Sequence, residues 1–525
     1  MKFKYNIIAA GIMMAAAASA QAQIYKVTLS GASENPPVVT NGTGSGVVTL
    51  NTTTHELRVK AVFSGLNGNT SASHIHCCVA TPTANAGVFT ATPSFPGFPL
   101  GVKEGSFDAI YSTAQAATWN ATAVTGNGGT VAGAEAALAT GAAAGGAYLN
   151  VHSTTSGGGE IRGTLVRFSF APASTAATSG LASALDSLGA GTGVVNDRLV
   201  ALASLNTSQQ SSALVSLLPV SSTVVSTLAS NALFADYDQI GNRLGGLRVA
   251  SEAGTGFWVK AGDHDGEQQL STRGVDVESD GWDVAGGLDY QLSTNSLLGA
   301  SLSYGEDSLE YSGLMFGSSG SLNGWRATAY GEQRIGTGFI EGMLTMASYD
   351  SDSARSAGVA GIANGSADID QWGGRVAAGM LWELGTGVSL TPQARLDWST
   401  IDLDGYQETN AGGLALNVGS QSEDRLRASF GGQLDWTMSP TIKPYVRAFW
   451  GSELKDDDSV TSASFATGGS PFVVRDAGLE NSGYVLGIGV NVVSGSNFGA
   501  ALSYDRTDGD TYQSNMLQAK ALWRF

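Results

Sequence analysis

Alternation of apolar and polar side chains dominates the chain from about residue 256 onwards. Stretches of roughly ten residues alternate apolar with small or polar side chains, and turn-forming Gly, Asp, Ser and Asn separate them, as in transmembrane β-strands. In the last stretch Leu517 and Trp523 fall on one face and Lys520 falls on the other. A soluble sheet alternates too, but an inner face rich in Gly, Asn, Lys and Arg suits a polar lumen better than a dry core. The pattern therefore predicts a transmembrane β-barrel.

Twelve stretches of this kind follow one another, an even number, as single-chain bacterial barrels have. They lie near residues 256–264, 278–292, 295–311, 320–334, 337–351, 367–383, 386–402, 424–438, 441–455, 481–494, 496–507 and 514–525. Tight turns alternate with longer polar connections such as 265–277, 403–423 and 456–480, which matches short periplasmic turns and longer external loops. Aromatic residues near the strand ends are expected in the two interfacial girdles: Trp258, Trp282, Tyr290, Tyr304, Trp450 and Trp523.

The N-terminal part, residues 24–170, has shorter apolar stretches that are broken by Gly, Pro and Asn. The only convincing helix in it is Ala132–Ala144. Half-buried strands are predicted at 27–29, 46–50, 56–63 and 161–165. Short strands separated by turn residues are typical of an all-β sandwich, which we expect here.

Helical spacing appears between these two parts, over residues 171–249. An Ala/Ser/Thr-rich linker at 171–180 precedes apolar positions three and four residues apart, and after Pro219 a second helical stretch runs to Val249. At 1.5 Å per residue, residues 220–249 would extend about 45 Å, longer than the roughly 30 Å hydrocarbon core. This helix could thread the barrel lumen as a stalk or plug. The alternative is an amphipathic helix packed on the periplasmic face.

Composition and charge exclude some structural and functional classes. After residue 22 no run approaches the roughly 20 apolar residues that a membrane helix needs, so spanning a membrane would require a closed barrel. The net charge of −18 argues against nucleic acid, whose phosphates require a basic surface. Lys2 and Lys4, the apolar stretch 7–18 and the small residues that follow predict a signal peptide over residues 1–22.

Four short motifs in the second half of the chain carry a resemblance to a known family. They are Asn242–Arg248 (NRLGGLR), Gly256–Lys260 (GFWVK), Gly281–Asp283 (GWD) and Leu522–Phe525 (LWRF). Together with the twelve strands they resemble the autotransporter β-domain of type V secretion. The resemblance implies a barrel over 250–525, a linker and lumen helix within 171–249, and location in the outer membrane of a Gram-negative bacterium. It also implies two partners, the outer-membrane lipid and the outer-membrane assembly machinery, with Trp523 and Phe525 as the barrel's C-terminal signal.

The N-terminal part carries a second set of motifs in order. They are Leu29–Val38 (LSGASENPPV), His74–His76 (HIH), Ala147–His152 (AYLNVH) and Gly159–Gly163 (GEIRG). This set resembles the CHRD domain, which is named after chordin. The resemblance implies that residues 23–170 form the passenger of the autotransporter, and it implies no activity, because the domain has no agreed biochemical role.

Three of the five histidines of the chain, His74, His76 and His152, lie in these motifs. Residues i and i+2 of a strand point to the same face, so His74 and His76 project side by side. If the strand of His152 is a neighbour, a three-histidine site for copper or zinc results, with Glu160 placed to orient a ligand. The alternative is that these histidines hydrogen-bond to the backbone and hold the fold.

Cys77 and Cys78 are the only cysteines and follow His76 directly. In an oxidising exterior we expect them to close a vicinal disulfide, although neighbouring Cα atoms lie closer together than those of ordinary disulfides. The alternatives are reduced thiols that bind copper, or small side chains that pack. Outside these motifs, His264 and the run Asp456–Asp458 are expected to be solvated loop residues.

Three functional hypotheses follow. The first is a non-catalytic autotransporter that displays or exports the passenger at the cell surface, since the sequence has no G-x-S-x-G elbow, H-E-x-x-H helix or phosphate-binding G-x-x-x-x-G-K-[ST] loop. The second is a surface metal-binding module or metalloenzyme that uses the three histidines. The third is an outer-membrane channel or structural protein whose N-terminal domain stays in the periplasm.

Overall fold

The computed structural model describes residues 22–524 apart from 82, 221, 251–254, 456–458, 477–481 and 495–496. The predicted signal peptide except Ala22, Phe525 and Asp456–Asp458 therefore lie outside the described residues. The chain forms two compact units. The first comprises residues up to Ser169 together with Leu188–Leu205, and the second comprises Phe170–Ser187 and Asn206 onwards.

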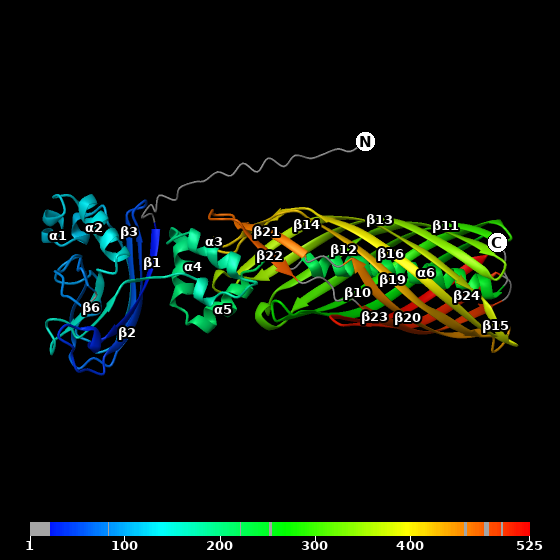
Figure 1. Ribbon diagram of the computed structural model, residues 1–525, viewed down its shortest axis with the longest axis horizontal. Coiled ribbons are helices and arrows are strands. Elements are labelled where there is room, and N and C mark those ends of the chain that lie inside the picture. The colour runs from blue at the N-terminus through cyan, green and yellow to red at the C-terminus, as the bar shows by residue number, and fades with distance from the viewer. Residues whose placement is uncertain are drawn as a thin grey trace. The chain divides into compact units, whose positions relative to one another are not determined.

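The first unit is built on one sheet of eight strands (Figure 1). They are β1 (Ala22–Ser30), β2 (Thr43–Asn51), β3 (Glu56–Ser64), β4 (Thr70–His76), β5 (Gly105–Ser112), β6 (Tyr148–Ser153), β7 (Ile161–Thr164) and β8 (Val166–Arg167). Their order is β4-β6-β7-β1-β2-β3-β5, with β8 beside β1. The pattern led us to expect two packed sheets, but pairing of Ser30 with Arg162 joins β1 to β7, so hydrogen bonds link all eight strands into one sheet.

One apolar core holds this unit together. Leu57, Ile75 and Leu149 are fully buried in it, and α2 (Val131–Ala143) contributes Leu138. The helix expected at Ala132–Ala144 is thus present within one residue, after a short α1 (Ala121–Gly126). A further helix, α4 (Gly193–Ser204), contacts β1 and β2. Residues 188–205, which the sequence placed in the linker and helix segment 171–249, therefore pack on the first unit.

The second unit contains a closed barrel of twelve strands (Figure 1). They are β9 (Gly256–Leu270), β10 (Val275–Ser293), β11 (Ser296–Tyr311), β12 (Ser319–Ile335), β13 (Gly338–Ser356), β14 (Ile362–Met380) with its continuation β15 (Trp382–Gly385), β16 (Val388–Leu403), β19 (Gln421–Trp436), β20 (Ile442–Lys455), β23 (Ser482–Ser494), β24 (Phe498–Gly509) and β25 (Tyr512–Arg524). The barrel closes where β25 pairs with β9, from Tyr512 opposite Gln268 to Arg524 opposite Gly256. All twelve predicted strands are confirmed.

The strands extend further into the long connections than the sequence suggested. Residues 265–277, expected as an external loop, form the end of the β9–β10 hairpin, in which Leu270 and Val275 are buried. The two longest connections form a small sheet of β17 (Tyr406–Gln407), β18 (Leu416–Val418), β21 (Ser459–Phe465) and β22 (Phe472–Asp476). Apolar side chains that alternate within these polar segments give the extra strands an inner face to bury.

The two faces of the barrel wall differ as the alternation predicts. Leu486, Ile488 and Leu517 are about half exposed on the outer face, whereas Gln518 is buried on the inner one. Trp258 is an exception among the expected girdle residues: it is 3% exposed and donates to the hydroxyl of Tyr330 inside the barrel (Nε1···Oη 3.0 Å). A shift of one residue reverses the face of a strand side chain, so here Phe257, not Trp258, points outwards.

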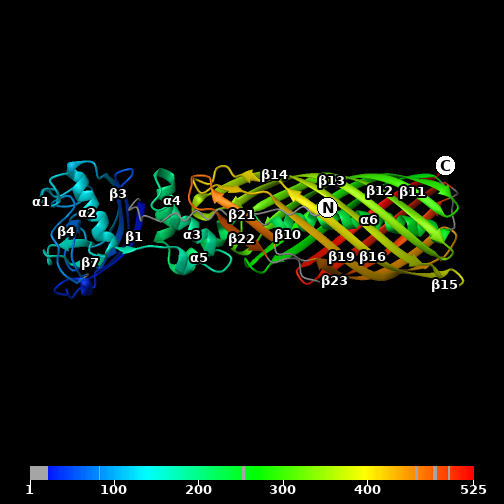
Figure 2. The same ribbon diagram turned by 45° about the horizontal axis from the view of Figure 1, so that its top comes forward.

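Helices occupy the barrel lumen and its end. The long helix α6 (Ser222–Ala250) runs inside the barrel in both views (Figures 1 and 2) and contacts β12, β13, β14, β16 and β21. The helix predicted at 220–249 is therefore present, and it lies in the lumen. The shorter α3 (Ser179–Ser187) packs on β22, and α5 (Thr207–Ser216) packs near residues 313–315 and 358–360 in the long connections. None of the described helices combines the length and the apolar character needed to cross a membrane.

Candidate functional sites: a histidine cluster and the barrel lumen

The three motif histidines meet on one face of the first unit's sheet. β4 and β6 are antiparallel neighbours, with His74 opposite Asn150 and Ala72 opposite His152. The ring centroids of His74 and His152 lie 4.6 Å apart, those of His74 and His76 lie 4.8 Å apart, and those of His76 and His152 lie 5.7 Å apart. One nitrogen of each ring lies within 4.8 Å of the other two. The pairing of β4 with β6 thus brings all three predicted ligands together.

Backbone carbonyls fix the tautomer of two of these rings. Nδ1 of His76 lies 2.8 Å from the carbonyl oxygen of Ala86, and Nδ1 of His152 lies 3.0 Å from that of Gly157. A carbonyl only accepts, so each Nδ1 must carry the proton and each Nε2 must carry a lone pair. Within the described part of the chain, neither Nε2 atom has a hydrogen-bond partner. His76 and His152 therefore present two basic nitrogens to the space between the rings.

His74 completes the group of buried, neutral rings. Neither of its nitrogens makes an aligned hydrogen bond among the described residues, although the nearby Pro93 carbonyl partly raises its pKa. Burial, with smaller contributions from His152 and His76, lowers the pKa of His74 to about 3. Burial likewise lowers the pKa of His76 to about 4 and lowers that of His152. Neutral imidazole is the form that binds a metal.

Glu160 does not orient a histidine, contrary to the sequence-based expectation. Its carboxylate accepts from the hydroxyl of Thr40 at 2.6 Å and from the backbone N–H groups of Asn67 and Gly68 at 2.5 and 3.2 Å. Burial raises the pKa of this carboxyl, but these hydrogen bonds together outweigh it and hold the pKa below its usual value. Glu160 thus anchors the loop after β3.

A polar network that the sequence did not reveal continues from the histidine cluster. Tyr148 stacks on the ring of His76 at 4.8 Å, and the guanidinium of Arg162 lies over Tyr148 at 4.6 Å. Arg162 also donates to Asn85 Oδ1 at 2.7 Å, one residue before the carbonyl that holds His76. Arg162 is therefore a positioning residue for His76. Arg162 belongs to the motif GEIRG, but sequence spacing could not show that its partner is the loop that contains Asn85.

Glu34 lies at the other side of Arg162. One carboxylate oxygen is 3.9 Å from Nε of Arg162, and the other has no hydrogen-bond partner among the residues described. Burial raises the pKa of Glu34 to about 7, although Arg162 and Asn150 act in the opposite direction. The motif around Glu34 therefore meets the motif around Arg162, and Arg162 contacts Tyr148, which stacks on His76.

Cys77 and Cys78 are joined by a disulfide directly after His76. Cys77 is buried in the apolar core, on the sheet face opposite the histidines. The sulfur atoms pack on Gly141 of α2, where an added Cβ would lie 2.2 Å from Sγ of Cys78. The disulfide therefore packs against α2 just after the end of β4, and it offers no thiolate to the cluster.

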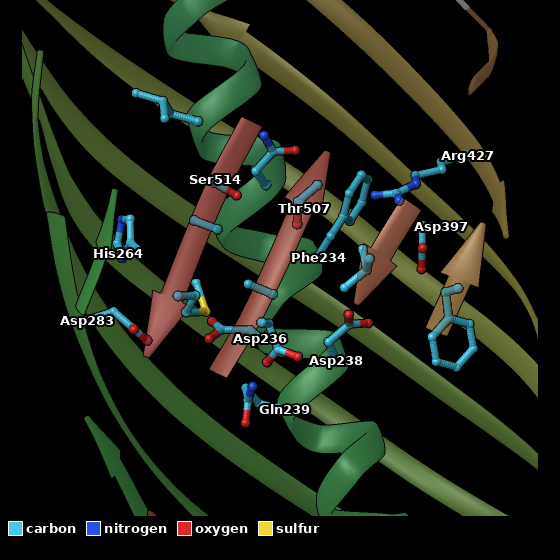
Figure 3. A pocket seen from close by; sticks show the side chains of 18 of the residues that line it. Phe234, Asp236, Asp238, Gln239, His264, Asp283, Asp397, Arg427, Thr507 and Ser514 are labelled. Carbon is cyan, nitrogen blue, oxygen red and sulfur yellow. The ribbon is translucent and has the colours of Figure 1, made fainter. Parts of the chain in front are cut away.

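The barrel lumen holds α6 through buried ion pairs on opposite walls. Asp236 accepts from Lys260 on β9 at 3.0 Å and from Arg326 on β12 at 2.7 Å. Asp238 lies 2.6 Å from Arg375 on β14, 3.0 Å from Arg395 on β16 and 3.7 Å from Arg447 on β20. Residues two apart on a helix point about 200° apart, so these carboxylates connect one helix to both sides of the wall. Figure 3 shows both carboxylates in the pocket beside α6.

Further pairs hold the C-terminal part of α6. Arg243 donates to Asp289 at 2.6 Å, and Arg248 contacts both Glu332 and Glu341, the latter at 2.5 Å. Arg243 and Arg248 belong to the motif NRLGGLR, but nothing in the sequence indicated their partners on the strands. The available signal was the charged residues of this helix and those on the inner face of the strands.

His264 belongs to this lumen and not to a solvated loop. It lies on β9 and lines the pocket beside α6 (Figure 3). Its Nε2 is 2.8 Å from Asp307 on β11. The loop prediction was wrong because β9 continues six residues beyond His264, to Leu270, with its alternation intact.

Together, the closed barrel, the helix that occupies its lumen and the separate N-terminal unit define the class of protein: an outer-membrane barrel with an N-terminal domain. The family model "Autotransporter beta-domain" matches residues 257–505, and the model "CHRD domain" matches residues 25–165. The chain therefore carries an autotransporter β-domain behind an N-terminal CHRD domain. It is a protein of the Gram-negative outer membrane.

Individual relatives are more distant. Lipase 1 of Photorhabdus luminescens is 28% identical over 235 residues, which are 43% of this chain and 35% of the lipase. Outer membrane protein B of Rickettsia prowazekii is 23% identical and covers 56% of this chain and 20% of its own length. The chain thus spans only about a third or less of these relatives. Among solved structures, the translocator domain of NalP from Neisseria meningitidis is 18% identical with a TM-score of 0.46, over 56% of this chain and 98% of that domain.

Proposed function

We propose that this protein is an autotransporter whose barrel anchors its CHRD domain in the outer membrane and displays it at the cell surface, without catalysis. The observation that carries the proposal is the course of α6 through the lumen. The helix begins near β21 in the long connections, where Ser222 lies 3.0 Å from Ser459, and it ends where the chain enters β9 at the short-turn end. Long connections are external in such barrels, so the chain before α6 leads to the outside.

Insertion and stability of such a barrel rest on two partners. Its half-exposed Leu, Ile and Val side chains suit lipid, and we propose that the general outer-membrane assembly machinery inserts it.

The absence of a G-x-S-x-G elbow from the sequence argues against extending lipase activity to this chain from Lipase 1. An esterase assay with a fatty-acyl ester on purified protein is expected to give no turnover above that of the isolated barrel, and clear turnover would contradict the non-catalytic role.

Site-specific proteolysis on intact cells tests the display. A protease recognition sequence inserted between Gly128 and Gly129, an exposed turn of the first unit, is expected to be cut on intact cells. The matched control carries the same insertion between Gly336 and Thr337, in the short turn between β12 and β13, and should be cut only after the outer membrane is permeabilised. If the first insertion is also protected on intact cells, the N-terminal unit is periplasmic and the third hypothesis replaces display.

A further inference from the structure

We propose that His74, His76 and His152 form a binding site for one copper or zinc ion in the CHRD domain. The ligands are Nε2 of His76, Nε2 of His152 and one ring nitrogen of His74. This inference is independent of where the barrel places the domain, because all three residues lie within the first unit.

The first step is that the cluster is costly without an ion. The three side chains are 5%, 7% and 7% exposed, yet their inward nitrogens have no hydrogen-bond partner in the regions that the structure describes. A buried polar atom that has no partner destabilises the folded state, because it has lost its hydrogen bonds to water. A cation among three lone pairs removes this cost at all three atoms together.

The second step is that the rings are already oriented as ligands. Metal-bound histidines usually donate their other N–H to a carbonyl or carboxylate, which fixes the tautomer. The carbonyls of Ala86 and Gly157 do this for His76 and His152. Arg162 in turn holds the loop of Ala86 through Asn85 and the carbonyl of Thr83, so the orientation of His76 is supported by a second layer of contacts.

The third step is distance. Nitrogens bound to copper or zinc at about 2.0–2.1 Å lie about 3.3–3.5 Å from one another. The candidate atoms lie within 4.8 Å of one another, so small ring rotations close the site around an ion. The backbones of the three histidines are held by the pairing of β4 with β6, so only the side chains need to move when the ion binds.

The fourth step is the choice of ion. A set of three neutral imidazoles without a carboxylate suits zinc and copper, whereas calcium and magnesium prefer oxygen ligands. The nearest acidic groups do not join the cluster, since Glu160 is committed to Thr40 and two backbone N–H groups and Glu34 faces Arg162. The disulfide between Cys77 and Cys78 leaves no thiolate to compete as a softer ligand.

The experiment uses the full chain, purified in detergent, stripped with a chelator, and then dialysed against copper or zinc ions in separate arms. We expect one bound ion per chain by elemental analysis in at least one arm, and a rise in the unfolding temperature of the N-terminal unit. His152→Asn should abolish both effects, since an amide can still donate to the Gly157 carbonyl but offers no imidazole. Binding of copper alone, zinc alone or both supports the site and identifies the ion.

Two matched controls carry the other histidines of the chain. His55→Asn changes the half-exposed histidine of the same unit, and His264→Asn changes the lumen histidine, so both should keep the ion. For bound copper(II), nitrogen hyperfine structure in the electron spin resonance spectrum should be lost only in the cluster variants. The proposal is overturned if the wild type binds neither ion, or if folded His152→Asn, with unchanged near-ultraviolet circular dichroism, binds as much metal as the wild type.

Discussion

At the scale of single residues, the N-terminal unit buries a group of polar side chains that contact one another. His76 stacks on Tyr148, Tyr148 lies under Arg162, and Arg162 approaches Glu34. These contacts connect the first, middle and last CHRD motifs, and the first and last of these are more than 100 residues apart in sequence. Buried polar groups that contact one another in this way specify one arrangement of the surrounding loops.

Glu34 makes the stability of this unit depend on pH. Its pKa is about 7 in the folded protein and near 4.5 when solvated, so the folded state binds the proton more tightly. Stability therefore falls as the pH rises from about 4.5 to about 7. Glu34→Gln should remove this part of the pH dependence and make the protein more stable than the wild type at pH 7.

Hydrogen exchange of peptides that cover β6 and β7, compared between variant and wild type at each pH, measures this effect. Glu104→Gln, on an exposed loop residue, serves as the control and should leave the pH dependence unchanged. An identical pH dependence in wild type and Glu34→Gln would show that the Glu34 carboxyl does not change its proton affinity on folding.

At the scale of elements, α6 and the barrel wall are matched by charge. Most of the described residues of the helix are buried inside the barrel, so its charged residues need partners on the strands. Asp238 alone faces Arg375, Arg395 and Arg447 from three different strands. Removing one partner of a buried ion pair leaves the other charges uncompensated.

Asp238→Asn is therefore expected to destabilise the folded barrel by about 3 kcal/mol. The midpoint of urea unfolding, followed by the change in gel mobility of the folded barrel, measures the loss. Asp280→Asn, an exposed residue of β10, is the matched control and should behave as the wild type does. Equal midpoints for Asp238→Asn and wild type would mean that the ion pairs do not hold the helix.

At the scale of the whole molecule, two compact units share one chain. The barrel completes its hydrogen bonding by pairing its last strand, β25, with its first, β9, and needs no strand of the first unit. Closure removes the exposed edges that an open sheet would present to lipid.

Two truncations test separately whether the barrel needs the first unit and whether it needs closure by β25. A chain without residues 23–205, behind the same signal peptide, should still give a barrel whose gel mobility changes on heating. A chain without residues 512–525 should give none, because β9 and β24 would lose their shared neighbour. A heat-modifiable barrel from the second truncation would contradict the requirement for closure by β25.

Sequence alone determined the features that repeat with the period of the backbone. Alternation of two residues specified twelve strands and the face of His74 and His76, and helical spacing specified α2 and α6, because these periods follow from local backbone geometry. Tertiary structure alone decided which distant residues meet. The pairing of β4 with β6 placed His152 beside His74, the register of β9 turned Trp258 inwards, and the position of α6 in the lumen gave Asp236 and Asp238 their partners. Such contacts depend on how separate elements pack, and no local period encodes them.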